Sequence, residues 1–243
     1  MRARAALAIA SAILLLAACN KNKATDDEAA ASSQAALDAQ MQPAFVAAFG
    51  QPSPVPHAVI RGGQEEQVQF EPKLLTDIGG GKLALISKGQ APEGGGTIAV
   101  QYLTQAGDKF TVTGQWFDLI PQSGASQNVP DIRLRKGLFA QPTLEIEAAD
   151  RKMGCDIASA SLYELLPAGP ALRAKDIVTE RNNIPMGAMR TGPQVDYYGN
   201  VIADNAGQTF KVHYHGSYEQ DVTWGPGKDG LWAPLGVVKL PEC

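Results

Sequence analysis

The sequence lacks an excess of charge of either sign. It carries 21 Lys and Arg residues against 25 Asp and Glu residues, a formal net charge of −4 at pH 7. Proteins that bind nucleic acid need a basic patch that neutralises phosphates. The balance of charge therefore argues against a nucleic-acid partner, and it provides no polybasic segment that would help the chain onto a membrane.

The chain also lacks the short motifs of nucleophilic hydrolases. It contains no Gly-x-Ser-x-Gly elbow and no Ser-x-x-Lys. The glycine-rich stretch TDIGGGKL (76–83) is not a phosphate loop, because Thr76 and Leu83 stand where that motif needs Gly and Ser or Thr. We expect a hairpin or loop there. Glu145 and Glu147 would share a strand face, which is typical of the solvent side of a sheet.

Long apolar runs are scarce, and the clearest one lies at the start of the chain. Residues 5–18 are all Ala, Leu, Ile or Ser, they follow Arg2 and Arg4, and they end at Cys19. The run is shorter than the ~20 residues that a membrane-spanning helix needs. A basic start followed by an apolar stretch of this length is typical of a secretory signal peptide. An ordinary signal peptide with a chance cysteine is one interpretation.

The second interpretation rests on Leu16-Ala17-Ala18-Cys19. These four residues resemble the lipobox of bacterial lipoproteins. The resemblance implies cleavage before Cys19 and attachment of lipid to its thiol, so residues 1–18 would be the signal peptide and the membrane would be reached through the lipid. Two or more acyl chains hold a protein stably on a bilayer. Asn20, where an Asp would signal retention at the inner membrane, favours the outer membrane, with the protein facing the periplasm.

Cysteine is scarce as well, with three in the whole chain. Cleavage would leave Cys19, 19 basic and 25 acidic residues, and two further cysteines, Cys155 and Cys243. Exported proteins meet an oxidising compartment in which disulfides persist. We therefore expect a Cys155–Cys243 disulfide; two separate buried thiols or a metal pair are the alternatives, and no Cys-x-x-Cys supports a metal site.

The rest of the chain predicts a mainly β (α+β) fold, as an antiparallel sheet, sandwich or barrel-like domain with a short N-terminal helix. We expect residues 19–33 to be a flexible tether and residues 34–243 to be a single domain. Apolar residues recur at helical spacing from Leu37 to Phe49, with Ser32 or Ser33 as N-cap. Pro43 falls inside this stretch, so the helix is either kinked or short, starting at Pro43, and it ends at Gly50.

Ten segments have the alternation or composition of strands. Gly, Pro, Asn and Asp separate them. We expect residues 121–140 to be a long loop and residues 167–206 to be irregular, because both are rich in turn-forming residues. The predicted strands are 57–62, 66–71, 82–87, 97–103, 109–116, 143–148, 161–166, 209–218, 222–224 and 236–240.

One internal similarity indicates a duplicated β unit. AGDKFTVTGQW (106–116) and AGQTFKVHYHGSY (206–218) share a pattern, and the strands before them, within 96–116 and 199–218, are also alike. Chance is the alternative, because every hairpin favours a glycine turn followed by alternating apolar residues.

Histidine supplies the one candidate for metal chemistry. His213 and His215 lie two apart on a predicted strand, so both side chains leave one face. They would hold Zn²⁺ or Cu²⁺ if His57, Asp204, Glu219 or Asp221 supplied a third ligand. The alternative is a solvated strand face, and we commit to no metal ligand, no catalytic residue and no cofactor.

Aromatic residues beside glycine-rich turns are candidates for ligand contact. Tyr197, Tyr198, Trp224 and Trp232 would stack on peptidoglycan sugars or contact an envelope protein, or else pack in the core. The sequence therefore favours a lipid-anchored envelope protein that acts by non-catalytic binding or by supporting an assembly. A periplasmic metal-dependent enzyme that uses His213 and His215 is the alternative.

Overall fold

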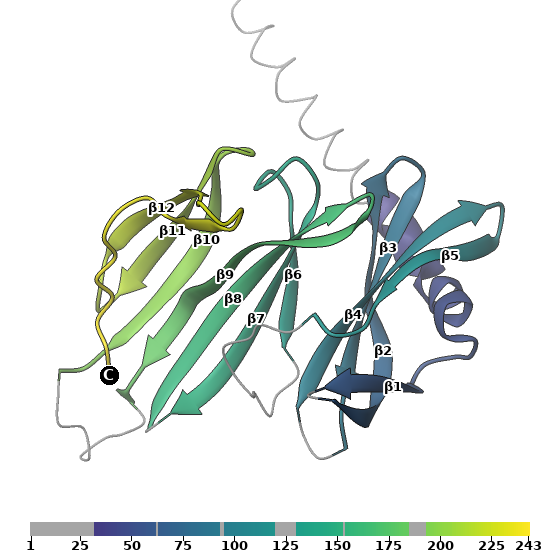
Figure 1. Cartoon of the computed structure of the whole chain (residues 1–243), viewed down its shortest axis with the longest axis horizontal. Coiled ribbons are helices and arrows are strands. Elements are labelled where there is room, and N and C mark those ends of the chain that lie inside the picture. Colours follow the sequence, from purple (N-terminus) through teal and green to yellow (C-terminus); the bar gives the residue numbers. More distant parts are fainter. Residues whose placement is uncertain (1–31, 62, 93–94, 120–129, 153, 185–192) are drawn as a thin grey trace, which may run out of the picture. The chain divides into compact units, whose positions relative to one another are not determined.

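The computed structural model describes residues 32–61, 63–92, 95–119, 130–152, 154–184 and 193–243. The chain divides into two compact units, Met1–Met41 and Gln42–Cys243. All the described strands belong to the second unit and form two antiparallel sheets, in which neighbours along the chain pair with one another (Figure 1). The predicted mainly β class is confirmed. The predicted signal peptide, Cys19 and most of the predicted tether lie outside the described residues.

The first sheet, sheet A, contains five strands in the order β1-β2-β3-β4-β5. The β2–β3 hairpin closes through Gly80 and Gly81, whose positive φ angles of 64° and 72° suit glycine. The stretch 76–83 is thus a hairpin, as predicted. Its strands are β1 Val55–Arg61, β2 Gln64–Gly79, β3 Lys82–Gln90, β4 Gly96–Ala106 and β5 Lys109–Trp116.

The second sheet, sheet B, contains eight strands in the order β13-β12-β11-β10-β9-β8-β7-β6. It is a single meander, so each connection is local. Its strands are β6 Asp131–Arg135, β7 Thr143–Lys152, β8 Cys155–Leu166, β9 Gly169–Asn182, β10 Asp196–Asn205, β11 Thr209–Gly216, β12 Gln220–Pro226 and β13 Trp232–Pro234.

Three loop and strand predictions are wrong. Region 167–206 contains β9 and β10, and region 121–140 contains β6, while residues 120–129 lie outside the described part. Bulges in the β8–β9 pairing and the positive φ of Asp176 interrupt the alternation of β9, so its pattern does not show a period of two. Segment 236–240 is not a strand, because it packs on sheet B through two side chains without joining the ladder.

The described helix covers residues 32–49, so Ser32 and Ser33 are helical and Pro43 does not start a short helix. It ends before Gly50, as predicted, where the Gly50 N–H donates to the Val46 carbonyl at 2.8 Å. Within the second unit, Phe45 is buried, and the Phe49 ring stacks on Phe70 of sheet A at a centroid distance of 5.5 Å. This part of the helix therefore covers sheet A through its apolar residues.

Apolar clusters among the described residues hold the second unit together. One lies between the sheets, where Ile86 and Val100 of sheet A share a cluster with Ile146 and Leu165 of sheet B. Another lies on sheet B and contains residues of β8 to β13 with Leu138 from the β6–β7 connection. The Gly207 N–H donates to the Leu138 carbonyl at 3.1 Å, so this connection contacts the β10–β11 turn.

The two segments that suggested duplication form corresponding hairpins. Strands β4 and β5 join at Gly107, and β10 and β11 join at Gly207, both with positive φ. The β10–β11 turn contains one residue more and a register shift after Ala203. Since hairpin formation alone produces this likeness, duplication stays a prediction.

Candidate functional site

The last residues of the chain cross sheet B and form the centre of the candidate site. We call residues 235–243 the C-terminal strap. The strap follows β13; its Leu235 N–H donates to the Thr223 carbonyl at 2.8 Å, and its Val238 and Leu240 side chains pack against the core of sheet B. These apolar contacts, two residues apart, place one side of the strap on the sheet.

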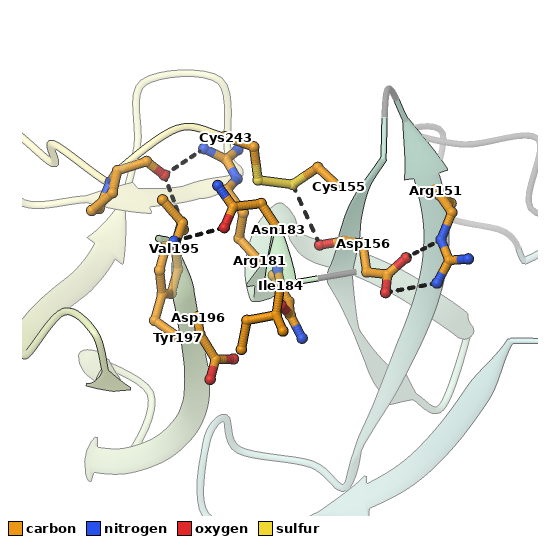
Figure 2. The surroundings of a disulfide bond; sticks show 12 residues. Arg151, Cys155, Asp156, Arg181, Asn183, Ile184, Val195, Asp196, Tyr197 and Cys243 are labelled. Carbon is orange, nitrogen blue, oxygen red and sulfur yellow. Dashed lines mark hydrogen bonds and ion pairs between the residues drawn. A yellow bond between two sulfur atoms is a disulfide. The ribbon is translucent and has the colours of Figure 1, made fainter. Parts of the chain in front are cut away.

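A disulfide between Cys155 and Cys243 fixes the end of the strap (Figure 2). The two residues are 88 apart in the sequence, and their Cα atoms are 6.2 Å apart. The predicted pairing is confirmed. Cys155 is the first residue of β8 and is buried, whereas Cys243 is exposed. The bridge therefore joins the last residue of the strap to the start of β8.

The side chain of Arg181, on β9, binds the backbone of the strap. Its Nη1 donates to the Pro241 carbonyl at 2.8 Å, and the Tyr197 hydroxyl donates to the same oxygen at 3.4 Å. Figure 2 shows Arg181 and Tyr197 close to Cys243. The Arg181 Nε is buried and has no partner among the described residues. The guanidinium therefore has a donor that the strap does not use.

Three tyrosines of sheet B gather beside Arg181. The Tyr197 ring lies 5.8 Å from the Tyr214 ring and 5.9 Å from the Tyr218 ring, measured between centroids. Burial is the main cause that raises the pKa of Tyr197 and of Tyr214 above the ordinary tyrosine value. Both hydroxyls therefore stay neutral near pH 7 and act as hydrogen-bonding groups.

The aromatic candidates separate into buried and exposed residues. Tyr197, Trp224 and Trp232 are buried, with Phe210 stacked at centroid distances of 5.6 Å and 5.7 Å from the two indoles. These tryptophans are core residues of sheet B. Tyr198 is exposed on the opposite face and stacks on His215 at 5.8 Å.

His213 and His215 lie on one face of β11, as predicted, with their rings stacked at a centroid distance of 6.0 Å, and His57 lies apart from them. His213 Nδ1 lies 2.7 Å from Asp221 Oδ1, and His215 Nε2 lies 3.0 Å from Asn200 Nδ2. His57 is on sheet A, where its ring stacks on Phe117 at 4.1 Å. Among the described residues, no group of three His, Cys, Asp or Glu side chains is arranged to hold a metal ion. The metal hypothesis thus gains no support from the described part of the chain.

Two glutamates predicted on a solvent face lie in a charged cluster. Glu145 is buried: its carboxylate accepts from Arg135 Nε at 2.6 Å and from Arg133 Nη1 at 3.2 Å, while Glu147 lies 3.5 Å from Arg133. The solvent-face prediction is wrong for Glu145. The pairing of β6 with β7 places Arg133 opposite Glu145, and this neighbour was not visible in the sequence of β7 alone.

Sequence reasoning missed Arg181, the central residue of this site. Its strand fell in a region predicted to be irregular, and a single arginine in a stretch without regular alternation has no distinguishing signal. The strap itself was detectable, since its apolar residues and its final cysteine are both plain in the sequence.

Comparison with known proteins identifies no relative: no family model, no curated protein and no solved structure matches the chain. Among the described residues, no helix has the length and apolar character needed to cross a membrane.

Proposed function

We propose that the chain is a lipid-anchored protein of the bacterial cell envelope. The lipobox-like Leu16-Ala17-Ala18-Cys19 carries this proposal, because it follows a basic start and an apolar run of secretory length. The Cys155–Cys243 disulfide supports it, since such bonds persist in exported proteins. Asn20 favours the outer membrane, with the domain facing the periplasm.

Mass spectrometry of the native protein tests the anchor. The expected N-terminal peptide begins at Cys19 and carries a diacylglyceryl thioether. Cys19→Ala should abolish incorporation of a labelled fatty acid, whereas Cys243→Ser should leave it unchanged. An unmodified Cys19 or an intact Met1 in the wild type contradicts the proposal.

We propose further that the β domain acts by binding or by supporting an assembly, with peptidoglycan or another envelope protein as partner. Support comes from the lack of hydrolase motifs in the sequence and from the residues gathered under the strap, which bind backbone and perform no evident acid–base chemistry. Crosslinking in intact cells, followed by purification, should recover one such partner reproducibly. Empty recovery from correctly localised protein counts against it.

Metal analysis distinguishes this role from the alternative metal-dependent enzyme. The binding role expects no stoichiometric metal in the purified wild type. Zinc or copper that is present in the wild type and lost in His213→Ala/His215→Ala would favour the enzyme.

A further inference from the structure

The strap occupies sheet B as a peptide ligand would occupy a groove. It is not part of the β-ladder. Its contacts with sheet B include two apolar side chains, two hydrogen bonds accepted by the Pro241 carbonyl, the hydrogen bond from the Leu235 N–H to the Thr223 carbonyl, and one covalent bond. Peptide-binding surfaces use the same elements, namely pockets for alternate side chains and donors for the peptide backbone. The strap therefore displays the chemistry that this surface recognises.

We propose that the face of sheet B under the strap is a binding groove for an extended peptide segment, and that the chain's own C-terminus fills it while the Cys155–Cys243 disulfide is intact. The recognised pattern is that of Val238-Lys239-Leu240-Pro241: two apolar residues two positions apart, followed by a backbone carbonyl. Val238 and Leu240 pack on the groove, and Arg181 with Tyr197 binds the carbonyl.

The strap does not use the full hydrogen-bonding strength of Arg181. Arg181 Nη1 donates to the neutral Pro241 carbonyl at 2.8 Å. A carboxylate in that place would accept from Nη1 through a charge-assisted hydrogen bond, which is stronger than a bond to a neutral carbonyl. A peptide whose carboxylate lies where the strap places the Pro241 carbonyl is therefore the better ligand.

The disulfide is the latch, by which we mean the bond that keeps the strap on the groove until it is reduced. A dithiol reductant opens it by exchange: its two thiols become a disulfide, and Cys155 and Cys243 each gain a proton and become thiols. Cys243 is exposed, whereas Cys155 is buried, so Cys243 is the end of the bridge that lies nearer to solvent. After opening, noncovalent contacts hold the strap, among them the Val238 and Leu240 side chains and the hydrogen bonds of Leu235 and Pro241. A competing peptide displaces a segment that is held in this way. This inference concerns the described domain and does not depend on lipidation of Cys19.

Fluorescence anisotropy with labelled peptides tests the groove. The protein is the full chain in two forms, the oxidised wild type and a variant with Leu240→Asp and Cys243→Ser, whose strap no longer competes. The peptides are GVVKLPE-amide, which copies the strap, GVVKLP with a free carboxylate at the position of Pro241, and GVDKDPE-amide, which has Asp at both apolar positions.

The opened variant should bind the strap copy, and it should bind the carboxylate peptide about tenfold more tightly. The oxidised wild type should bind neither, and no form should bind the Asp peptide. Arg181→Gln in the opened variant should remove the tenfold advantage, while Arg151→Gln, on an exposed arginine that pairs with Asp156, should keep it.

Two outcomes overturn the proposal: an opened variant that is folded by circular dichroism and binds no peptide, or an oxidised wild type that binds as well as the opened variant. If the variant does not fold, the dithiol-reduced wild type replaces it. Hydrogen exchange of residues 236–243 should then become faster on reduction and slow again when the carboxylate peptide is added. Unchanged exchange on reduction contradicts the latch.

Discussion

At the scale of single residues, buried charge in sheet B is stabilised by partners that the neighbouring strand supplies. Glu145 is 1% exposed and accepts hydrogen bonds from two arginines. A buried carboxylate without such partners would be strongly destabilising. The pair is therefore a stability requirement that follows from strand pairing.

Removing one of these arginines should destabilise the fold. Arg135→Ala leaves Glu145 with Arg133 as its remaining ion-pair partner, and we expect the free energy of unfolding to fall by about 3 kcal/mol. Arg151→Ala, which removes the more exposed pair with Asp156, should change it much less. Urea unfolding at pH 7 measures both, and equal effects would contradict the role of burial.

Buried tyrosines should make the protein sensitive to alkali. Burial raises the pKa of Tyr102 and of Tyr214 in the folded protein, whereas unfolded tyrosine ionises near pH 10. The unfolded state therefore loses protons first, so this contribution to stability is complete below about pH 10 and is lost as pH rises further. Urea unfolding between pH 8 and pH 11 should show that decline.

Tyr102→Phe separates the hydroxyl from the ring. The Tyr102 hydroxyl is buried and has no hydrogen-bond partner among the described residues. Its removal should leave stability at pH 7 unchanged or slightly higher and should reduce the alkaline decline. A loss of more than about 1 kcal/mol at pH 7 would show that the hydroxyl has a partner.

At the scale of elements, one residue joins the end of β9 to the start of β10. Asn183 is buried; its Nδ2 donates to the Pro193 carbonyl at 3.0 Å, and its Oδ1 accepts from the Val195 N–H at 2.9 Å. One backbone hydrogen bond, from the Asn183 N–H to the Val195 carbonyl at 2.9 Å, continues this contact. Both strands border the candidate groove, so Asn183 positions Arg181 and Tyr197 relative to one another.

Asn183→Ala should lower the free energy of unfolding by about 2 kcal/mol, because the Val195 N–H loses the acceptor of a buried hydrogen bond and the Pro193 carbonyl loses its donor. Asn182→Ala is the matched control: the Asn182 Oδ1 accepts one exposed hydrogen bond from Ile184, so its loss should have a small effect. Thermal or urea unfolding measures the difference. Similar losses for both variants would argue against Asn183 as the link.

The strands also show which elements can be predicted from the alternation of apolar and polar residues. Residues 109–116 were predicted as one half-buried strand, and β5 has that range and that alternation. Strand β9 was missed because register shifts interrupt its period, and β6 because a short charged strand resembles the polar loop around it. Periodicity identifies regular strands and fails where bulges or edges change the pattern.

At the scale of the whole molecule, the disulfide connects the last residue to the start of β8. Closing a loop of this length reduces the entropy of the unfolded chain, which is worth about 4 kcal/mol in the chain-entropy model. The bond thus stabilises sheet B and holds the strap on it.

Cys155→Ser/Cys243→Ser should therefore lower the free energy of unfolding by about 4 kcal/mol, measured by urea unfolding without reductant. The wild type in excess dithiol should match the double variant, and dithiol should have no further effect on the double variant. Equal stability of oxidised and reduced wild type would contradict the contribution of the bond.

The sequence alone determined the β class, most strand positions, the end of the helix and the cysteine pair, because periodicity, turn residues and redox context act locally or by composition. It also predicts the lipid anchor at Cys19. Only the tertiary structure decided which face of each strand is buried, that Glu145 meets two arginines, and that Arg181 and Tyr197 lie under the strap. These depend on pairing between distant segments, and strand register, which the sequence does not display, sets that pairing.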